Sequence, residues 1–546
     1  MFHVSLVRPL ARLGAILALC SAFVLLIGSL AFPSANAANL LPVNQILNAD
    51  GTLDLAAAPN GAFDLRGWNV TLDALRGPIL APARSGNARP AYAVGDWSAL
   101  GSNGADDGAL TSIVYALAVS GTDVYVGGIF TDVNNNGTVL PEADYVAKWD
   151  GTNWSALGSN GAGNGALNSI VYALAVSGTN LYVGGFFENV NNNGTVLGEA
   201  DFIAKWDGTN WSALGSDGAG NGSLNNGVHA LAVSATDLYV GGQFQNVNNN
   251  GTVLGAADRI AKWNGTNWSA LGSNGAGNGA LNNIVLALAV SGTDVYVGGN
   301  FINVNNNGTV LPEADYIAKW DGTNWSALGS NGAGNGSLGN TVNALAVIGT
   351  DVYVGGQFQN VNNNGTVLGE ADFIAKWDGT NWSALGSDGA GNGSLNSLVF
   401  ALAVSGTDLY VGGWFGNVNN NGTVLGAADR IAKWNGTNWS ALGSNGAGNG
   451  SLNTDVYALA VSSTHLYVGG EFTDVNNNGT VLSAADYVAR FEIASTTASD
   501  LAAFHARVNT QQVVLLKWAT LDESQIAGFN VYRRVGKKEW RQINAQ

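Results

Sequence analysis

The chain of 546 residues has a single cysteine, Cys20, and it lies inside an apolar run from Leu13 to Phe32. Two arginines precede this run, and Ala35-Asn36-Ala37 follows it, so residues 1–37 have the parts of a secretory signal peptide. The run approaches membrane-spanning length, and an uncleaved anchor is the alternative, but Pro33 and the A-x-A sequence favour cleavage. We expect a secreted protein whose mature chain has no disulfide, thiolate nucleophile or cysteine metal site.

Charged residues are also scarce, at 11% of the chain, and the net charge is −17. Lysine and arginine form no cluster in the central part of the sequence, which argues against nucleic acid or an anionic membrane surface as a partner. Beyond the N-terminal segment there are three histidines, His229, His465 and His505, each in a different sequence context. This inventory disfavours a histidine metal site or a Ser-His relay.

The rest of the sequence is dominated by seven tandem copies of one 57-residue unit. The tryptophan that opens each "WSALGS" marks the period, at Trp97, Trp154, Trp211, Trp268, Trp325, Trp382 and Trp439. Copies one to three match copies four to six in order, through "PEADY", "GEADF" and "GAADR", which indicates that a three-unit block was duplicated.

The two blocks differ mainly at a few positions of the unit. Fourteen of their twenty-five differences fall at the positions equivalent to Ser112, Ile113, Tyr115, Ile129 and Thr131, which we call the variable columns. Exposed stretches such as "NNNGTV" barely change, whereas neutral drift would affect them comparably. We therefore interpret the variable columns as a recognition surface on a constant scaffold.

Each unit contains four runs typical of short strands, separated by turn signals. In copy one these are Val114–Val119, Val124–Phe130, Tyr145–Trp149 and Trp154–Leu157. Four antiparallel strands in a repeat of this length predict a blade of a β-propeller, with a solenoid as the competing fold.

The ends of the array favour the propeller. It begins with a lone "WSAL" strand at Trp97 and stops after the third strand of copy seven, where Phe491 replaces the usual tryptophan. Pairing of these ends closes a ring and removes two sheet edges. We predict an all-β, seven-bladed propeller over residues 91–494, closed by its N-terminal strand, and a monomer.

The motifs "VYALAVSGTDLYVGG.F" and "IAKWDGTNWSALG" resemble the kelch-type repeats of secreted bacterial proteins and of the fungal cortical polarity-marker family. Residues 497–546, with "LAAFHARV", "VVLLKWAT" and "GFNVYRRV", resemble the opening of a fibronectin type III-like β-sandwich, of which they would form about half. Residues 38–90 are expected to form an extension and linker. The first resemblance implies a propeller and does not specify an activity.

One loop of each unit resembles a calcium-binding loop. In "DVNNNGTV", Asp132, Asn134 and Asn136 are spaced as alternate oxygen ligands, followed by a glycine at the sixth position. The twelfth position is Ala143, with Asp144 one place late, and position one is neutral in most copies. The alternative is an Asn-rich loop held by side-chain to backbone hydrogen bonds, and this is the reading we favour, with no cofactor required.

The variable columns are predicted to lie together. If the first two strands form a hairpin, the start of one lies beside the end of the next, so all five columns meet at the edge opposite the "SGTD" turn, around one mouth of the central channel. Two columns carry large aromatic and amide side chains, which suit recognition. The first comprises Tyr115, Tyr172, His229, Leu286, Asn343, Phe400 and Tyr457, and the second Ile129, Phe186, Gln243, Asn300, Gln357, Trp414 and Glu471.

Three functions are compatible with this sequence. The leading hypothesis is a secreted or cell-surface-associated, non-enzymatic protein that binds a protein or a surface glycan through the variable face. The second is a carbohydrate-active enzyme on the same face, which requires paired carboxylates; the acids we expect in the variable columns, Glu471 and Glu188, lie two blades apart round a closed ring. The third is a structural spacer, surface-layer or stalk protein.

Overall fold

The computed structural model describes residues 95–493, apart from Thr236, and the backbone of several strands outside this range. The described range falls in one compact unit, and residues 1–91 and 495–546 form a second. The strands of the second unit are β1 (Phe2–Leu6), β2 (Leu40–Pro42), β3 (Ala62–Asp64), β4 (Trp68–Asp73), β5 (Gly77–Pro82), β48 (Leu501–Val508), β49 (Val514–Thr520), β50 (Phe529–Arg533) and β51 (Arg541–Gln542).

These strands include the expected runs near the C-terminus, and β48 pairs with β49 in antiparallel fashion. Apart from the strands just given, the predicted signal peptide, linker and sandwich module lie outside the described residues. No helix in the part of the chain that the structure describes is long and apolar enough to cross a membrane.

The first repeat folds into a four-stranded antiparallel sheet. Its strands are β7 (Val114–Ser120), β8 (Asp123–Gly128), β11 (Val146–Trp149) and β12 (Trp154–Ala156), in the order β7-β8-β11-β12 from inside to outside. All four predicted strands are therefore present, with ends shifted by one or two residues. The turn before β12 is held by Asp150, whose Oδ1 accepts hydrogen bonds from the backbone N–H groups of Thr152 and Asn153, at 2.8 and 2.7 Å.

The same sheet recurs in every repeat. The innermost strands of blades 2–7 are β13 (Val171–Ser177), β19 (Val228–Ser234), β25 (Val285–Ser291), β31 (Val342–Ile348), β37 (Val399–Ser405) and β43 (Val456–Val461). The second strands are β14 (Asn180–Gly185), β20 (Asp237–Gly242), β26 (Asp294–Gly299), β32 (Asp351–Gly356), β38 (Asp408–Gly413) and β44 (His465–Gly470). The third strands are β17 (Ile203–Trp206), β23 (Ile260–Trp263), β29 (Ile317–Trp320), β35 (Ile374–Trp377), β41 (Ile431–Trp434) and β47 (Val488–Glu492). The outermost strands of blades 2–6 are β18 (Trp211–Ser212), β24 (Trp268–Ala270), β30 (Trp325–Ser326), β36 (Trp382–Ser383) and β42 (Trp439–Ala441).

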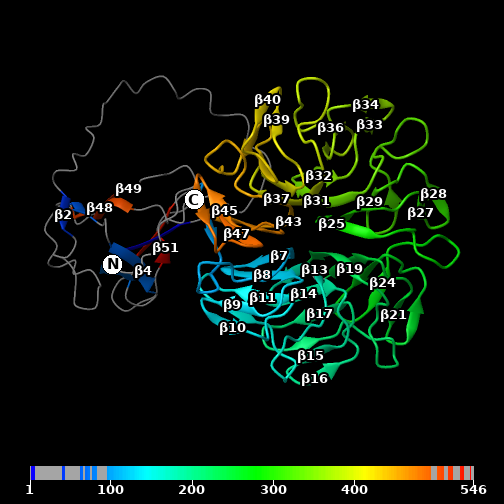
Figure 1. Ribbon diagram of the computed structural model, residues 1–546, viewed down its shortest axis with the longest axis horizontal. Helices are drawn as coiled ribbons and strands as arrows, with labels where there is room; N and C mark the ends of the chain where they lie inside the picture. The colour runs from blue at the N-terminus through cyan, green and yellow to red at the C-terminus, as the bar shows by residue number, and fades with distance from the viewer. Residues whose placement is uncertain are drawn as a thin grey trace. The chain divides into compact units, whose positions relative to one another are not determined.

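The blades are arranged as a closed ring (Figure 1). Innermost strands of successive blades are neighbours, and β43 of blade 7 lies next to β7 of blade 1. The apolar cores lie between blades: Tyr125 of blade 1, for example, packs in one cluster with Val171 and Trp206 of blade 2. Each blade therefore buries its faces against its two neighbours.

The outermost strand of blade 7 comes from the start of the array, as predicted. Strand β6 (Trp97–Ala99) pairs with β47, with Trp97 opposite Phe491 and Ser98 opposite Arg490. The Trp97 side chain is fully buried, and its Nε1 donates a hydrogen bond of 2.8 Å to the carbonyl oxygen of Leu442. Burial of this side chain joins the two ends of the propeller.

A small hairpin that the four-strand prediction omits lies within the long loop of each repeat. In blade 1 it consists of β9 (Val133–Asn135) and β10 (Thr138–Leu140), and both turn residues, Asn136 and Gly137, have positive φ. Asn-Gly between valines is a known signal for such a turn, so the sequence did carry the information. The other hairpins are β15 (Val190–Asn192) with β16 (Thr195–Leu197), β21 (Val247–Asn249) with β22 (Thr252–Leu254), β27 (Val304–Asn306) with β28 (Thr309–Leu311), β33 (Val361–Asn363) with β34 (Thr366–Leu368), β39 (Val418–Asn420) with β40 (Thr423–Leu425), and β45 (Val475–Asn477) with β46 (Thr480–Leu482).

These hairpins lie at the outer rim of the ring, next to the outermost strands (Figure 1). Each exposes one valine, with more than half of its surface accessible in every blade; in blade 1 this is Val139. The hairpins of constant sequence therefore lie at the outer rim, and other residues surround the channel mouth.

Candidate functional site

A β-bulge in the innermost strand of every blade displaces the residue of the Tyr115 column. In blade 1 Val114 pairs with Gly128 and Ala116 with Gly127, which leaves Tyr115 without a partner on β8. A bulge redirects its extra side chain, and here the glycines make room. A Cβ on Gly128 would lie 2.1 Å from the carbonyl oxygen of Ile113, and one on Gly127 would lie 2.5 Å from Val171 of the next blade. The repeated double glycine thus serves the bulge and the packing between blades.

The bulged residues form an arc of side chains around the channel. Adjacent rings are in contact from Phe400 through Tyr457, Tyr115 and Tyr172 to His229, with centroid separations between 4.9 and 5.4 Å. All five side chains are partly buried. The arc crosses the ring closure between blades 7 and 1, so it exists only in the closed propeller.

Burial changes the titration of this arc. It raises the pKa of the Tyr115 hydroxyl, with smaller contributions from Tyr172 and Glu471, and it lowers the pKa of His229 to about 4. The Nε2 atom of His229 is buried and makes no hydrogen bond within the described residues. His229 is therefore a neutral, largely apolar ring at neutral pH, packed between Tyr172 and Phe186.

The Ile129 column lies beside this arc, as the hairpin argument predicts. The backbone N–H of Ile129 donates to the carbonyl oxygen of Ile113 at 3.1 Å, which brings the two strand ends together. Two side chains of this column contact the next blade: Phe186 contacts His229 edge-on at 5.5 Å, and Asn300 Oδ1 lies 3.3 Å from Thr341 Oγ1. Because the innermost strands of successive blades are neighbours, the variable columns lie round one ring, with contacts between blades at these two junctions.

The ring has two chemically different parts. The aromatic arc extends over blades 6, 7, 1 and 2 and ends at His229 of blade 3, and Trp414 of blade 6 adds a side chain that is 53% exposed. Blades 3, 4 and 5 carry amides and one leucine: Gln243, Asn300, Gln357, Leu286 and Asn343. Asn343 is held in place because its Nδ2 donates to the carbonyl oxygen of Val399 at 3.1 Å.

A further column belongs to this face and was missed by the sequence comparison. It comprises Tyr145, Phe202, Arg259, Tyr316, Phe373, Arg430 and Tyr487, all of which have φ between 61° and 66°. This conformation is strained for large side chains and costs on the order of 1–3 kcal/mol per residue. The column escaped notice because it is the same in both duplicated blocks and varies only within a block. The sequence signal that could have revealed this column is its variation among blades, seen in the final residue of "PEADY", "GEADF" and "GAADR".

One carboxylate pair at the channel mouth corrects the sequence analysis. Asp455, in the Ile113 column, is a third acidic residue of the variable columns that we overlooked. The Tyr457 hydroxyl lies 3.4 Å from Asp455 Oδ2 and 3.4 Å from Glu471 Oε2. Burial raises the pKa of Asp455, although Arg430, whose Nη1 is 3.5 Å from Asp455 Oδ1, opposes the shift. Glu471 is exposed, so the two carboxyl groups have different environments.

The candidate calcium loop has other uses for its oxygen atoms. Asn134 Oδ1 accepts a hydrogen bond from the Gly137 N–H at 2.8 Å, and Asn136 adopts the left-handed conformation of the hairpin turn. Asp144 accepts one hydrogen bond from the Asp132 N–H at 2.9 Å and another from the Gly165 N–H of the next repeat at 3.1 Å. The side-chain to backbone interpretation accounts for these contacts, and Asp144 acts as a link between blades.

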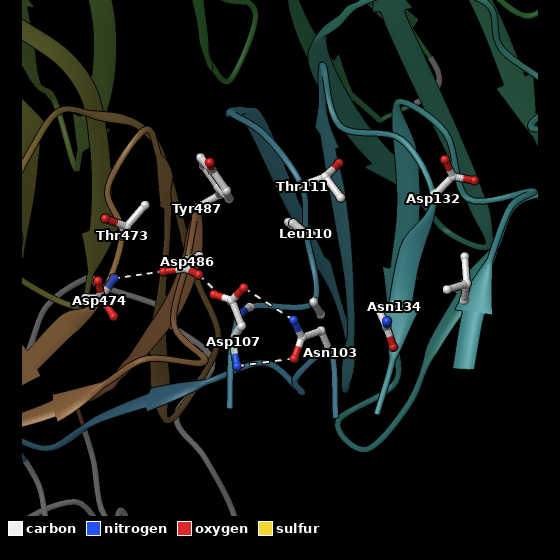
Figure 2. A pocket seen from close by; sticks show the side chains of 13 residues that line it. Asn103, Asp107, Leu110, Thr111, Asp132, Asn134, Thr473, Asp474, Asp486 and Tyr487 are labelled. Atoms are coloured by element: carbon white, nitrogen blue, oxygen red, sulfur yellow. Dashed lines mark hydrogen bonds between the residues drawn. The ribbon is translucent and has the colours of Figure 1, made fainter. Parts of the chain in front are cut away.

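The corresponding link at the ring closure is different. There Asp486 accepts hydrogen bonds from Gly108 and Asp474 N–H groups, at 3.1 and 2.8 Å, and a further hydrogen bond joins its carboxyl group to that of Asp107. Figure 2 shows the Asp107 and Asp486 side chains pointing toward each other. At the other six junctions the Asp107 position is occupied by asparagine, as at Asn164.

This closing junction contains a groove of about 640 Å³ on the variable face. Blade 7 contributes Thr473, Asp474, Asp486 and Tyr487 to its wall, and blade 1 contributes residues that include Asp107 and Asp132 (Figure 2). A second groove, of about 360 Å³, lies at the junction of blades 3 and 4 and is lined mainly by amides, with Asp258 and Arg259. The junction grooves thus differ in charge.

The strand pairings define the class of the protein as a seven-bladed β-propeller. Its fold is similar to the computationally designed Ika8 protein (17% identity, TM-score 0.35), covering 72% of this chain and 99% of that one. It is also similar to the WD40 β-propeller domain of Doa1 (10% identity, TM-score 0.35), covering 70% of this chain and 93% of that one. A nidogen/laminin complex contains a third similar chain (11% identity, TM-score 0.28, 56% and 84% covered). No protein-family model and no curated protein sequence matches the chain.

Proposed function

We propose that this propeller binds a macromolecular ligand, a protein or a surface glycan, through the ring of variable side chains at its channel mouth. One observation carries the proposal: the positions that changed after the block duplication lie together at the ends of the first two strands of each blade, around the channel. Aromatic and amide groups supply contact area and hydrogen bonding at recognition surfaces. The exposed Trp414 and the partly exposed tyrosine arc are the anchors of this surface.

The experiment is a pull-down and glycan-array screen with the full chain, followed by alanine substitution of Tyr115, Phe400 and Trp414. These variants should abolish binding while far-UV circular dichroism stays that of a β-propeller. Val310→Ala and Val367→Ala, which change exposed rim valines, form the matched control and should leave binding intact. Unchanged binding in the triple variant would overturn the placement of the site.

A second candidate function is suggested by Asp455 and Glu471. Two carboxyl groups within 3.4 Å of one tyrosine hydroxyl, one partly buried and one exposed, resemble the acid and base of glycoside hydrolysis. The carboxyl group with the raised pKa, that of Asp455, would donate the proton, and Glu471 would act as base or nucleophile. Hydrolysis of aryl glycosides by the full chain, abolished in Asp455→Asn and in Glu471→Gln, is the test; no turnover by the wild type would remove this candidate.

We further propose that the protein is exported through the segment at residues 1–37, in keeping with its lack of other cysteines. The kelch-type and fibronectin type III-like resemblances suggest a secreted or cell-surface setting. Detection of the chain outside the producing cell, with an N-terminus after Ala37, would test this.

A further inference from the structure

Several acidic residues of the variable face gather in blades 7 and 1, while Glu188 of blade 2 lies outside this sector. Asp107, Asp455 and Glu471 are each the single acidic residue among seven equivalents, and Asp132 and Asp474 are the two acidic residues of their column. All five belong to blades 7 and 1. We call these five residues the acidic sector. The repeat template has neutral residues at these positions, so the charge was added locally.

The acidic sector continues from the groove into the channel mouth. Asp107, Asp132 and Asp474 line the groove at the ring closure, and Tyr487 lies on the same wall. Burial raises the pKa of the Tyr487 hydroxyl, and the charges of Asp486, Asp107 and, at the mouth, Glu471 raise it further. Tyr487 is therefore close enough to the groove acids and to Glu471 for the charges of both to act on its hydroxyl.

Aromatic side chains border this sector on the mouth side. Tyr457 packs against Tyr115 and Phe400, with ring centroids 5.4 and 5.3 Å apart, and its hydroxyl lies between Asp455 and Glu471. Arg430 is the basic side chain that pairs with this group, at 3.5 Å from Asp455. Carboxylates beside aromatic rings complement ammonium and guanidinium groups through charge and cation–π attraction.

We propose that the acidic sector binds a basic, extended segment of a partner protein, with lysine or arginine side chains in the groove and at the aromatic mouth. This inference rests on the proposed function and specifies the partner. Charge complementarity favours it over a neutral glycan, which would gain little from five carboxylates. A groove of about 640 Å³ accommodates a few residues of extended chain.

The test uses two synthetic dodecapeptides, one alternating lysine and glycine and the other alternating glutamine and glycine. Isothermal titration calorimetry with the full chain should detect the lysine peptide and not the glutamine peptide, and binding should weaken as salt screens the charges. The double variant Glu471→Gln, Asp474→Asn should weaken binding about tenfold, which corresponds to roughly 1.4 kcal/mol. Both replacements already occur in these columns, at Gln243 and Asn189, so folding should be preserved.

The control changes the same charge elsewhere on the face. Asp217 and Asp388 occupy the Asn103 column in other blades, and Asp217→Asn with Asp388→Asn should leave lysine-peptide affinity within about twofold. Equal losses in the two double variants would overturn the sector as the site. Failure of the lysine peptide to bind, or tighter salt-independent binding of a neutral oligosaccharide, would overturn the partner's chemistry. The proposed function would survive either result if the Tyr115, Phe400 and Trp414 variants still abolish binding of the screened ligand.

Discussion

The carboxyl groups of Asp107 and Asp486 hydrogen-bond to each other across the junction where the propeller closes. The two residues are 379 positions apart in sequence, and the side chain of Asp486 is buried, with 7% of the residue exposed. A hydrogen bond between carboxyl groups requires a proton on one of them. The junction that closes the ring is the one of the seven with this carboxyl pair, because the other six have asparagine at the Asp107 position.

This pair predicts a stability that depends on pH. Burial and the neighbouring Asp107 raise the pKa of Asp486 above its ordinary value of 3.8, even though N–H donors from Asp474 and Gly108 act in the opposite direction. A raised folded pKa contributes stability that is present below pH 3.8 and is lost as the pH rises through the folded pKa. Asp107→Asn should remove this pH-dependent loss of stability. The measurement is the difference between the melting temperatures of the wild type and the variant, followed from acidic to neutral pH. The converse variant, Asn164→Asp, places the same acid beside Asp144 and should create a second such loss; parallel profiles for all three proteins would contradict the prediction.

The burial of His229 predicts a pH dependence of stability with the opposite sign. Burial lowers its pKa from 6.5 to about 4, so the folded state disfavours the charged imidazole. The contribution of neutral His229 to folding stability is present above pH 6.5 and is lost as the pH falls toward 4. His229→Phe, which copies Phe400 from the duplicated block, should abolish this acid-side loss of stability. Denaturant titrations at several pH values between 4 and 7 measure it, and NMR titration of the imidazole with a midpoint near 6.5 would refute it.

Closure by β6 predicts a strong effect of its removal. Deletion of residues 91–101 removes the fully buried Trp97 and exposes the edge of β47, so the chain should melt at much lower temperature and associate through that edge. Trp97→Ala alone should cost about 3–5 kcal/mol. Trp268→Ala, at the equivalent position inside blade 3, is the control: it should be similarly destabilised but stay monomeric, because the chain remains continuous there. Light scattering after size-exclusion chromatography distinguishes the associated deletion variant from the monomeric Trp268→Ala variant. A monomeric deletion variant would argue against closure by this strand.

The bulge predicts that one glycine of each pair cannot be replaced. In blade 5 a Cβ on Gly356 would lie 2.2 Å from the carbonyl oxygen of Thr341, whereas one on Gly339 would meet no atom within 4 Å. Gly356→Ala should lower the free energy of unfolding by about 1–3 kcal/mol, and Gly339→Ala should be near neutral. Urea denaturation of both variants provides the measurement. Equal stability would show that the bulge tolerates a side chain.

Much of the fold could be read from the repeats because each blade is specified locally. Strands β7, β8, β11 and β12 follow from apolar runs and turns that recur seven times, and Phe491 in place of tryptophan indicated where the ring closes. The rim hairpin was missed although its Asn136-Gly137 turn was visible, because the loop was assigned as one piece. The variable columns were placed correctly from hairpin geometry, which depends only on neighbouring strands.

What the sequence could not specify are the contacts of individual side chains, both within a blade and across the junction where the ring closes. The sequence alone determined the repeat, its strands and the columns that vary, because local hydrogen bonding and alternation of side chains set them. Only the tertiary structure decided that a bulge turns Tyr115 into the channel, that Asp455 and Glu471 approach one hydroxyl, and that Asp107 faces Asp486. The bulge and the carboxyl pair form within single blades and depend on how neighbouring strands pair there, whereas the contact between Asp107 and Asp486 depends on closure of a loop of nearly 400 residues, which no single repeat encodes.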